Sequence, residues 1–105
     1  MKRPLKRGDV YWVNLDPTVG SEIRKARPAV IISPDDFNHN LPRVIIAPLT
    51  TKGTPLGCRP FVRFKRKNAL ILLDQIRAVD KSRLVSREGE ISTEVWLPIL
   101  IEMFE

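Results

Sequence analysis

The apolar residues of this chain gather in short runs, and the segments between these runs mostly carry proline or glycine. Apolar runs of about four to eight residues suit strands better than helices, which need longer stretches. The run DVYWVNL is also rich in the aromatic and β-branched residues that favour strands. Five strands are expected, at residues 9–15, 28–32, 43–49, 61–64 and 70–73. They predict a mainly β fold, a small β-barrel rather than a helical bundle.

A short helix is expected after the second strand. Ser33 is a capping residue, Pro34 suits the first helical position, and two acids follow it. Pro42 limits this helix to a turn or two.

A second helix is expected near the C-terminus, where Ser92 or Thr93 can cap it. Its apolar face would consist of Trp96, Leu100 and Met103. Pro98 removes a hydrogen bond from any helix that contains it in its interior. The helix is therefore expected either to begin near Pro98 or to bend there.

The length of 105 residues favours a single domain over residues 1–105, because one compact domain takes on the order of 100–150 residues. Apolar residues make up 43% of the chain, which is enough for one core. A domain this small leaves much of its surface wet and gains from dimerising, so a homodimer is plausible on size alone.

The sequence predicts a soluble, cytoplasmic protein. No apolar segment approaches the roughly 20 residues that cross a bilayer. The N-terminal residues lack the apolar stretch of a signal peptide. The single cysteine, Cys58, cannot form a disulfide within the chain.

The charge of the chain is unevenly distributed. The net charge is +6, yet residues 1–87 hold all 18 basic residues and seven of the 12 acids, an excess of 11 positive charges. The last 18 residues hold five acids and no base. Clustered Lys and Arg gain free energy by displacing counterions from phosphates, so the basic part suits a polyanionic ligand. A solvated basic surface kept for solubility is an equal alternative.

The sequence gives little support for a metal site or a nucleotide-binding loop. The chain has one cysteine and one histidine, Cys58 and His39, too few for a structural zinc site. Gly20, Gly53 and Gly57 are not part of a phosphate-binding glycine loop. His39 lies in a turn-like segment and is expected at the surface. We therefore expect no metal and no cofactor.

Four motifs in order resemble the MazF/PemK toxin family: RGDVYWVNLDPTVGSE, ARPAVIIS, VIIAPLTT and LLDQIRAVDKSRL. The similarity covers roughly residues 6–84. It implies an SH3-like β-barrel of the CcdB/PemK type with short helical turns and a C-terminal helix, assembled as a homodimer. It also implies the toxin of a type II toxin-antitoxin system, an endoribonuclease that cuts single-stranded RNA or mRNA, inhibits translation and growth, and is silenced by a cognate MazE-like antitoxin.

The same resemblance implies site residues. Arg27 and Thr50 match the catalytic pair of the family, and Glu22, Asp74 and Gln75 match positions that line its RNA groove. The full set of expected RNA contacts is Ser21, Arg24, Lys25, Thr51, Asp74, Gln75 and Arg77.

These residue types suit metal-free RNA cleavage, in which the ribose 2′-hydroxyl attacks the phosphate and leaves a 2′,3′-cyclic phosphate and a 5′-hydroxyl. Arg27 can hold two phosphate oxygens and stays charged, so it is better as an electrostatic clamp than as a proton donor. Thr50 can donate or accept one hydrogen bond at the phosphate. Glu22, the carboxylate of the loop before Arg27, is the candidate base if burial raises its pKa.

Each of these residues also has a structural alternative. Arg27 can pair with a carboxylate, and Thr50 can satisfy backbone at a strand end. Asp74 and Gln75 can bond an adjacent loop. Trp12 and Trp96 are expected in the core or at a dimer interface rather than as stacking platforms for bases.

The basic run of Arg63, Lys65, Arg66 and Lys67 is expected to be a solvated hairpin end, with contact to an RNA backbone as the alternative.

The chain departs from the family in two loops. Residues 23–26 read Ile-Arg-Lys-Ala where the family commonly has glutamine and glycine, and residues 51–60 are short and carry proline and glycine. Two other functions stay open: a CcdB-like toxin that binds gyrase through its C-terminal helix without cleaving RNA, and a plain single-strand-binding barrel.

Overall fold

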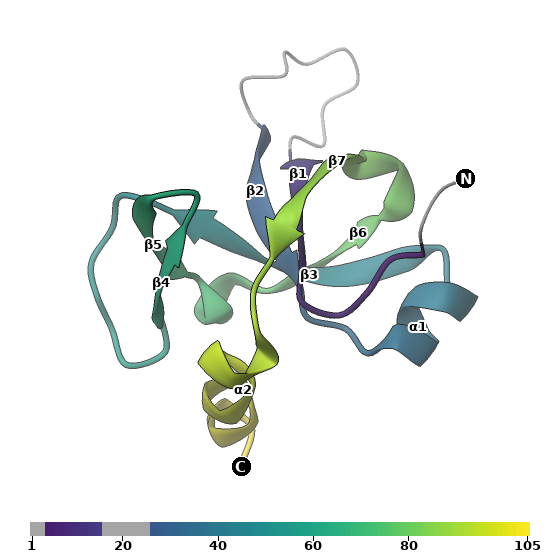
Figure 1. Ribbon diagram of the computed structural model, residues 1–105. Coiled ribbons are helices and arrows are strands. Elements are labelled where there is room, and N and C mark those ends of the chain that lie inside the picture. Colours follow the sequence, from purple (N-terminus) through teal and green to yellow (C-terminus); the bar gives the residue numbers. More distant parts are fainter. Residues whose placement is uncertain (1–3, 16–25) are drawn as a thin grey trace.

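The computed structural model describes residues 4–15 and 26–105, which form a mainly β fold around a curled, half-barrel sheet (Figure 1). Its seven strands are β1 Asp9–Asn14, β2 Ala26–Ile31, β3 Arg43–Thr50, β4 Phe61–Phe64, β5 Lys67–Ile71, β6 Arg77–Asp80 and β7 Leu84–Glu90. The strand order is β4-β5-β3-β2-β1-β7, and β6 pairs with β3. Every strand pair is antiparallel.

Within residues 4–15 and 26–105 the helical segments are short. They are α1 Asp35–Asn40 and α2 Leu97–Met103, with 3-10 turns η2 Leu73–Gln75, η3 Lys81–Arg83 and η4 Thr93–Val95. The helix expected after Ser33 is confirmed as α1, but Pro34 is its N-cap rather than its first helical residue, and Ser33 does not cap it. The Ser33 hydroxyl instead accepts a hydrogen bond from Ile45 N at 3.0 Å. The C-terminal helix begins at Leu97 with Pro98 in its first turn. Of the two expected alternatives, the helix therefore begins near Pro98 rather than bending there. Ser92 caps η4 instead, because its hydroxyl accepts a hydrogen bond from Glu94 N at 3.2 Å.

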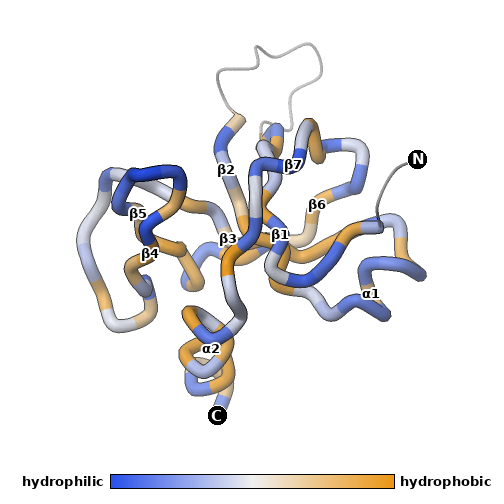
Figure 2. Tube along the Cα trace, in the orientation of Figure 1, coloured by the Kyte–Doolittle hydropathy of each residue, from blue (hydrophilic) through white to orange (hydrophobic). Residues whose placement is uncertain are grey.

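The central strands are buried on both faces, which explains why their sequences are continuously apolar rather than alternating. Val30 of β2 packs in a core cluster with Trp96 of the C-terminal segment. Its neighbours Ala29 and Ile31 belong to a second cluster with Val44 of β3. In Figure 2 the centre of the sheet is accordingly apolar, whereas the end of the β4–β5 hairpin is strongly hydrophilic. Trp96 is fully buried, as expected for a core residue.

Two strands are not predicted by the sequence. In β6 and β7 charged residues interrupt the apolar pattern, and β7 contains only two apolar residues, Leu84 and Val85. β7 nevertheless pairs with β1 along its length, with register shifts on either side of Tyr11 and Trp12. These segments form strands because they pair with β3 and β1, although their own sequences favour a strand only weakly.

The sheet forks at its upper end. The pairing of β2 with β3 runs from Ile31 to Ala29, which faces Pro48, and then stops. Beyond Pro48, β3 pairs instead with β5, at Leu49 and Thr50. Pro28 has no N–H to donate toward β3. The carbonyl of Pro48 accepts a hydrogen bond from Leu72 N at 2.8 Å, on the β5 side of β3. The two strands part at these prolines, and β2 and β5 diverge from there (Figure 1).

The β4–β5 hairpin faces β2 across this fork. Its two turn residues, Lys65 and Arg66, have φ of 49° and 67°, a left-handed conformation that costs a side-chain-bearing residue about 1–2 kcal/mol. The hairpin rests on β7, where Gly89 leaves room for Phe64: a Cβ at Gly89 would lie 3.0 Å from two ring carbons of Phe64. The Lys65 amine also bonds the Glu88 carboxylate at 2.8 Å.

No helix among the described residues is long and apolar enough to cross a membrane.

Candidate functional site

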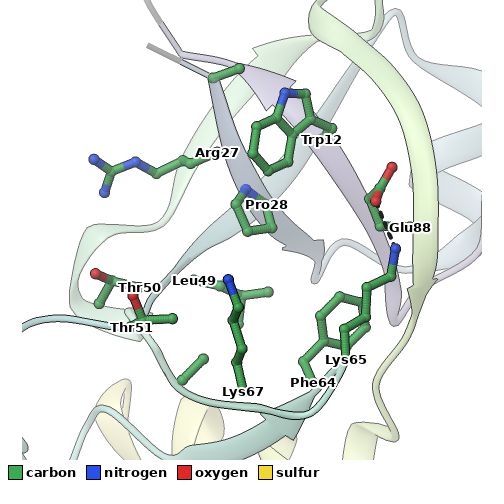
Figure 3. A pocket seen from close by; sticks show the side chains of 12 residues that line it. Trp12, Arg27, Pro28, Leu49, Thr50, Thr51, Phe64, Lys65, Lys67 and Glu88 are labelled. Carbon is green, nitrogen blue, oxygen red and sulfur yellow. Dashed lines mark hydrogen bonds and ion pairs between the residues drawn. The ribbon is translucent and has the colours of Figure 1, made fainter. Parts of the chain in front are cut away.

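A groove of about 440 Å³ opens in the fork of the sheet (Figure 3). Trp12, Pro28 and Leu49 belong to three adjacent strands, with Trp12 directly paired to Pro28. Polar and charged side chains surround this apolar row. The groove is lined by Trp12, Ala26, Arg27, Pro28, Leu49, Thr50, Thr51, Phe64, Lys65, Lys67, Ala69 and Glu88.

Arg27 and Thr50, from β2 and β3, lie on the same side of this groove (Figure 3). Continuing the pairing of Ala29 with Pro48 by two residues would align Arg27 with Thr50, but the strands have already parted. Their side chains therefore sit at the two arms of the fork. Arg27 is exposed, and within the described residues no carboxylate forms an ion pair with it. A guanidinium at an open groove with no ion-pair partner in the described part of the chain suits an anionic ligand.

The hydroxyl of Thr50 has a backbone partner. Its oxygen accepts a hydrogen bond from Lys52 N at 3.1 Å, which is the strand-end contact that the structural alternative anticipates. The same contact leaves the hydroxyl proton available for donation to a ligand, since a hydroxyl is both donor and acceptor. The adjacent Thr51 is exposed and also lines the groove.

Asp74 and Gln75 are not part of the groove lining, and neither is Arg77. The Arg59 guanidinium holds Asp74 through a fork of two hydrogen bonds, 3.0 Å to Oδ1 and 2.9 Å to Oδ2. A third donor of Arg59 bonds the carbonyl of Thr54 at 3.0 Å. Asp74 thus ties the loop of residues 51–60 to η2, which is the structural alternative for this residue.

The charge of Asp74 is set by the same contact. The hydrogen bond from Arg59 holds the pKa of the Asp74 carboxyl below its usual value. Arg77 lies on β6, where its guanidinium approaches the carbonyl of Leu15 at 3.5 Å. The sequence motif alone does not reveal these contacts, because Arg59 is fifteen residues from Asp74 and Leu15 is 62 residues from Arg77.

Four expected site residues lie outside the described part of the chain: Ser21, Glu22, Arg24 and Lys25.

The opposite side of the groove carries residues that sequence reasoning did not assign to the site. Phe64, Lys65 and Lys67 come from the β4–β5 hairpin, and Glu88 comes from β7. Trp12 is 36% exposed and is not a core residue. The basic hairpin run was the one signal in the sequence for this wall, but the position of the hairpin depends on contacts with β7 that are remote in sequence.

Glu88 is a carboxylate within the groove, but it is engaged. It accepts hydrogen bonds from Lys65 and from the Ser86 hydroxyl, each at 2.8 Å. The bond from Lys65, followed by that from Ser86, lowers the pKa of Glu88. A carboxylate stabilised in its charged form is a weaker base, so Glu88 is poorly suited to accept a proton from a substrate.

Over residues 4–15 and 26–105, no group of three or more His, Cys, Asp or Glu side chains is arranged to hold a metal ion. His39 is exposed, as expected, and one ring nitrogen lies 3.0 Å from the carbonyl of Leu5.

Comparison with known proteins agrees with the motifs. The family model for PemK-like, MazF-like toxins of type II toxin-antitoxin systems matches residues 6–101. Endoribonuclease EndoA of Bacillus subtilis (strain 168) is 35% identical over 97 residues, which covers 87% of this chain and 84% of that protein.

Solved structures of low sequence identity share the fold. MazF from Deinococcus radiodurans (form I) superposes with a TM-score of 0.78 at 21% identity, covering 98% of both chains. A MazE–MazF structure from the same organism (form II) gives a TM-score of 0.78 at 21% identity, covering 98% of this chain and 97% of that one. These relatives favour neither a gyrase-binding toxin nor a plain strand-binding barrel. The chain belongs to the family of PemK-like, MazF-like toxins of type II toxin-antitoxin systems.

Proposed function

We propose that this toxin is an endoribonuclease that cleaves single-stranded RNA without a metal ion, in the groove at the fork of the sheet. The observation that carries the proposal is that Arg27 and Thr50, which are distant in sequence, line one groove in which Arg27 has no ion-pair partner among the described residues. The name of the relative EndoA supports the reaction class.

The proposed reaction begins with attack of a ribose 2′-hydroxyl on the adjacent phosphorus. Arg27 binds two nonbridging oxygens and stabilises the charge that grows on them, because its planar fork matches the phosphate and stays protonated. Thr50 donates its hydroxyl proton in a hydrogen bond to the same phosphate. The P–O5′ bond then breaks and the departing oxygen takes a proton from water, leaving a 2′,3′-cyclic phosphate and a 5′-hydroxyl.

The base that takes the 2′ proton is assigned to Glu22, by its position in the family motif. Glu88 is the carboxylate that lines the described groove, and its lowered pKa disfavours it for this role. Ser21, Arg24, Lys25 and Thr51 are proposed to contact the RNA near the cut. Gln75 and Arg77, which do not line the groove, are proposed to contact the bound strand outside it. Asp74 is proposed to act indirectly, by holding the loop of residues 51–60 through Arg59.

The proposed partners are a cognate antitoxin and a second copy of the chain. Solved relatives include a MazE–MazF structure and a mycobacterial endoribonuclease in complex with its cognate antitoxin, which supports an antitoxin partner. A homodimer is supported by the small size of the chain and by its exposed apolar side chains.

The test is RNA cleavage by purified protein in the presence of EDTA. Arg27→Ala is expected to lower the rate by roughly 100-fold or more, the scale of losing one charge-stabilising donor. Thr50→Val keeps the shape of the side chain, removes its hydroxyl, and should have a smaller effect of the same kind. Arg43→Ala is the matched control, because Arg43 is an exposed arginine at the opposite end of β3.

Products should carry a 2′,3′-cyclic phosphate, detectable by mass spectrometry. Cleavage that requires added magnesium, or that Arg27→Ala leaves intact, contradicts the proposal.

A further inference from the structure

We propose that the wall of the groove opposite Arg27 is a second RNA-contact site, in which Lys67 binds a backbone phosphate and Trp12 stacks on a base. The inference rests on the proposed function for the identity of its ligand, single-stranded RNA. It assigns a role to the basic hairpin and to Trp12, neither of which the proposed cleavage step uses.

Lys67 is the lysine of this wall that is available for a ligand. Its amine points into the opening of the groove (Figure 3). Among the described residues it forms no ion pair. Lys65, by contrast, is held by Glu88 at 2.8 Å. The groove therefore presents two cations from different strands, Arg27 and Lys67, that form no ion pair with residues 4–15 or 26–105. Two separated cations suit a ligand with more than one phosphate, such as a nucleic-acid backbone.

Trp12, on β1, supplies an aromatic surface to the same groove. Its side chain lines the groove beside Pro28 and is 36% exposed, although the neighbouring strand residues Val10 and Val13 are fully buried. Unstacked bases of a single strand bind aromatic faces, and every base offers such a face. A duplex, whose bases are already stacked, cannot use this surface.

The hairpin is built to hold Lys67 in place. Lys67 directly follows the two left-handed residues Lys65 and Arg66, positions at which Asn or Gly would be less strained. The hairpin also closes onto β7 through the contact of Phe64 with Gly89. Positive φ at both residues is the geometry of a two-residue hairpin turn, so the turn and the contact with β7 together fix where Lys67 begins β5.

The test compares Lys67→Gln with Arg66→Gln. Both variants remove one positive charge from the same hairpin, but Arg66 does not line the groove. Affinity is measured by fluorescence anisotropy on a short, random-sequence 2′-O-methyl RNA, which cannot be cleaved because it lacks the 2′-hydroxyl. Lys67→Gln should weaken binding about two- to five-fold at moderate salt. It should also reduce the slope of log K against log salt by about 0.7, the loss of one phosphate contact. Arg66→Gln should change the slope by less than half as much.

Trp12 is tested by its own fluorescence. The chain has two tryptophans, and Trp96 is fully buried, so quenching by added RNA should report Trp12. Trp12→Phe should abolish most of the quenching while keeping most of the affinity. Trp12→Ala should weaken binding roughly ten-fold.

The outcomes separate this inference from the proposed function. Cleavage by the wild type, with Lys67→Gln and Arg66→Gln binding alike or Trp12 unquenched, would overturn the second contact site and leave the nuclease intact. Binding that depends on Lys67 and Trp12 without any cleavage would support the site and remove the nuclease. Absence of RNA binding by the wild-type protein overturns both.

Discussion

At the scale of single residues, the pair of Arg59 and Asp74 shows how one side chain can change the role of another. The motif LLDQIR places Asp74 with the groove residues of the family, but in this chain Arg59 occupies both of its oxygens. The fork also reaches Thr54, so a single guanidinium fixes the middle of the loop of residues 51–60. This loop begins directly after Thr50. We therefore regard Arg59 and Asp74 as residues that position the loop beside the groove.

The ion pair predicts a pH dependence of stability. Because the folded-state pKa of Asp74 is depressed by Arg59, its contribution is present above the unfolded pKa of about 4 and is lost as pH falls through the lower folded pKa. Asp74→Asn should therefore lower the thermal midpoint at neutral pH, and the difference from wild type should vanish in acid. Thermal melts followed by circular dichroism between neutral and strongly acidic pH measure this.

Asp80→Asn is the control for that prediction. Asp80 is an exposed aspartate that forms no ion pair within the described residues. A difference between Asp74→Asn and wild type that stays constant down to the most acidic pH would show that the ion pair is not its source.

At the scale of elements, local sequence accounts for the strands but not for the groove. The apolar runs predict β1 to β4, and the helix-start signal after Ser33 predicts α1. The fifth strand is expected at residues 70–73 but is β5 Lys67–Ile71, with Leu73 in η2. The motifs predict Arg27 and Thr50 as neighbours, and both line the groove. The wall of the groove opposite Arg27 could not be predicted in the same way. Alternation assigns Trp12 to a face of β1, but it cannot say that this end of the face stays uncovered when β2 and β3 part.

The wall opposite Arg27 depends on contacts between segments that are remote in sequence. Phe64 reaches Gly89, and Lys65 reaches Glu88 across 23 residues. β7, which supplies both partners, is itself a strand that its charged sequence does not predict. Residues 16–25, which hold Glu22 and three expected RNA contacts, lie outside the described structure, and their role stays a prediction.

Docking of the hairpin on β7 gives a prediction at this scale. Gly89→Ala adds a methyl group 3.0 Å from the Phe64 ring at a φ of +152°, so the ring or the strand must move. We expect a loss of about 1–3 kcal/mol in unfolding free energy, as in other overpacked sites. We also expect weaker RNA binding, since the hairpin carries Lys67. Urea denaturation and RNA anisotropy measure the two effects.

Gly57→Ala is the matched control, because a Cβ at Gly57 would meet no atom within 4 Å. It should leave both stability and binding near wild type. If Gly89→Ala lowers stability while RNA affinity and its salt dependence stay unchanged, the hairpin does not depend on β7 for its position in the groove.

At the scale of the whole molecule, charge and apolar surface are distributed differently. The described basic residues of the groove lie at the fork, whereas α2 and the residues after it are acidic and apolar. Ile101 and Phe104 are 54% and 71% exposed, beside an apolar groove lined in part by Ile32, Ile45 and Leu100. Exposing apolar side chains of this size to water costs free energy, and burying them in a protein interface would recover it.

The proposed homodimer is therefore predicted to use this end of the molecule. Light scattering coupled to gel filtration should give about twice the chain mass of 12.0 kDa for the wild type. Ile101→Glu combined with Phe104→Glu should shift the protein toward the monomer, because two carboxylates would be buried in each half of the interface. Leu56→Glu serves as control, since Leu56 is a comparably exposed apolar residue in the loop of residues 51–60. A dimer that survives the double substitution with its dissociation constant unchanged would place the interface elsewhere. A monomeric wild type would contradict the proposed dimer but would not affect the proposed chemistry of the groove.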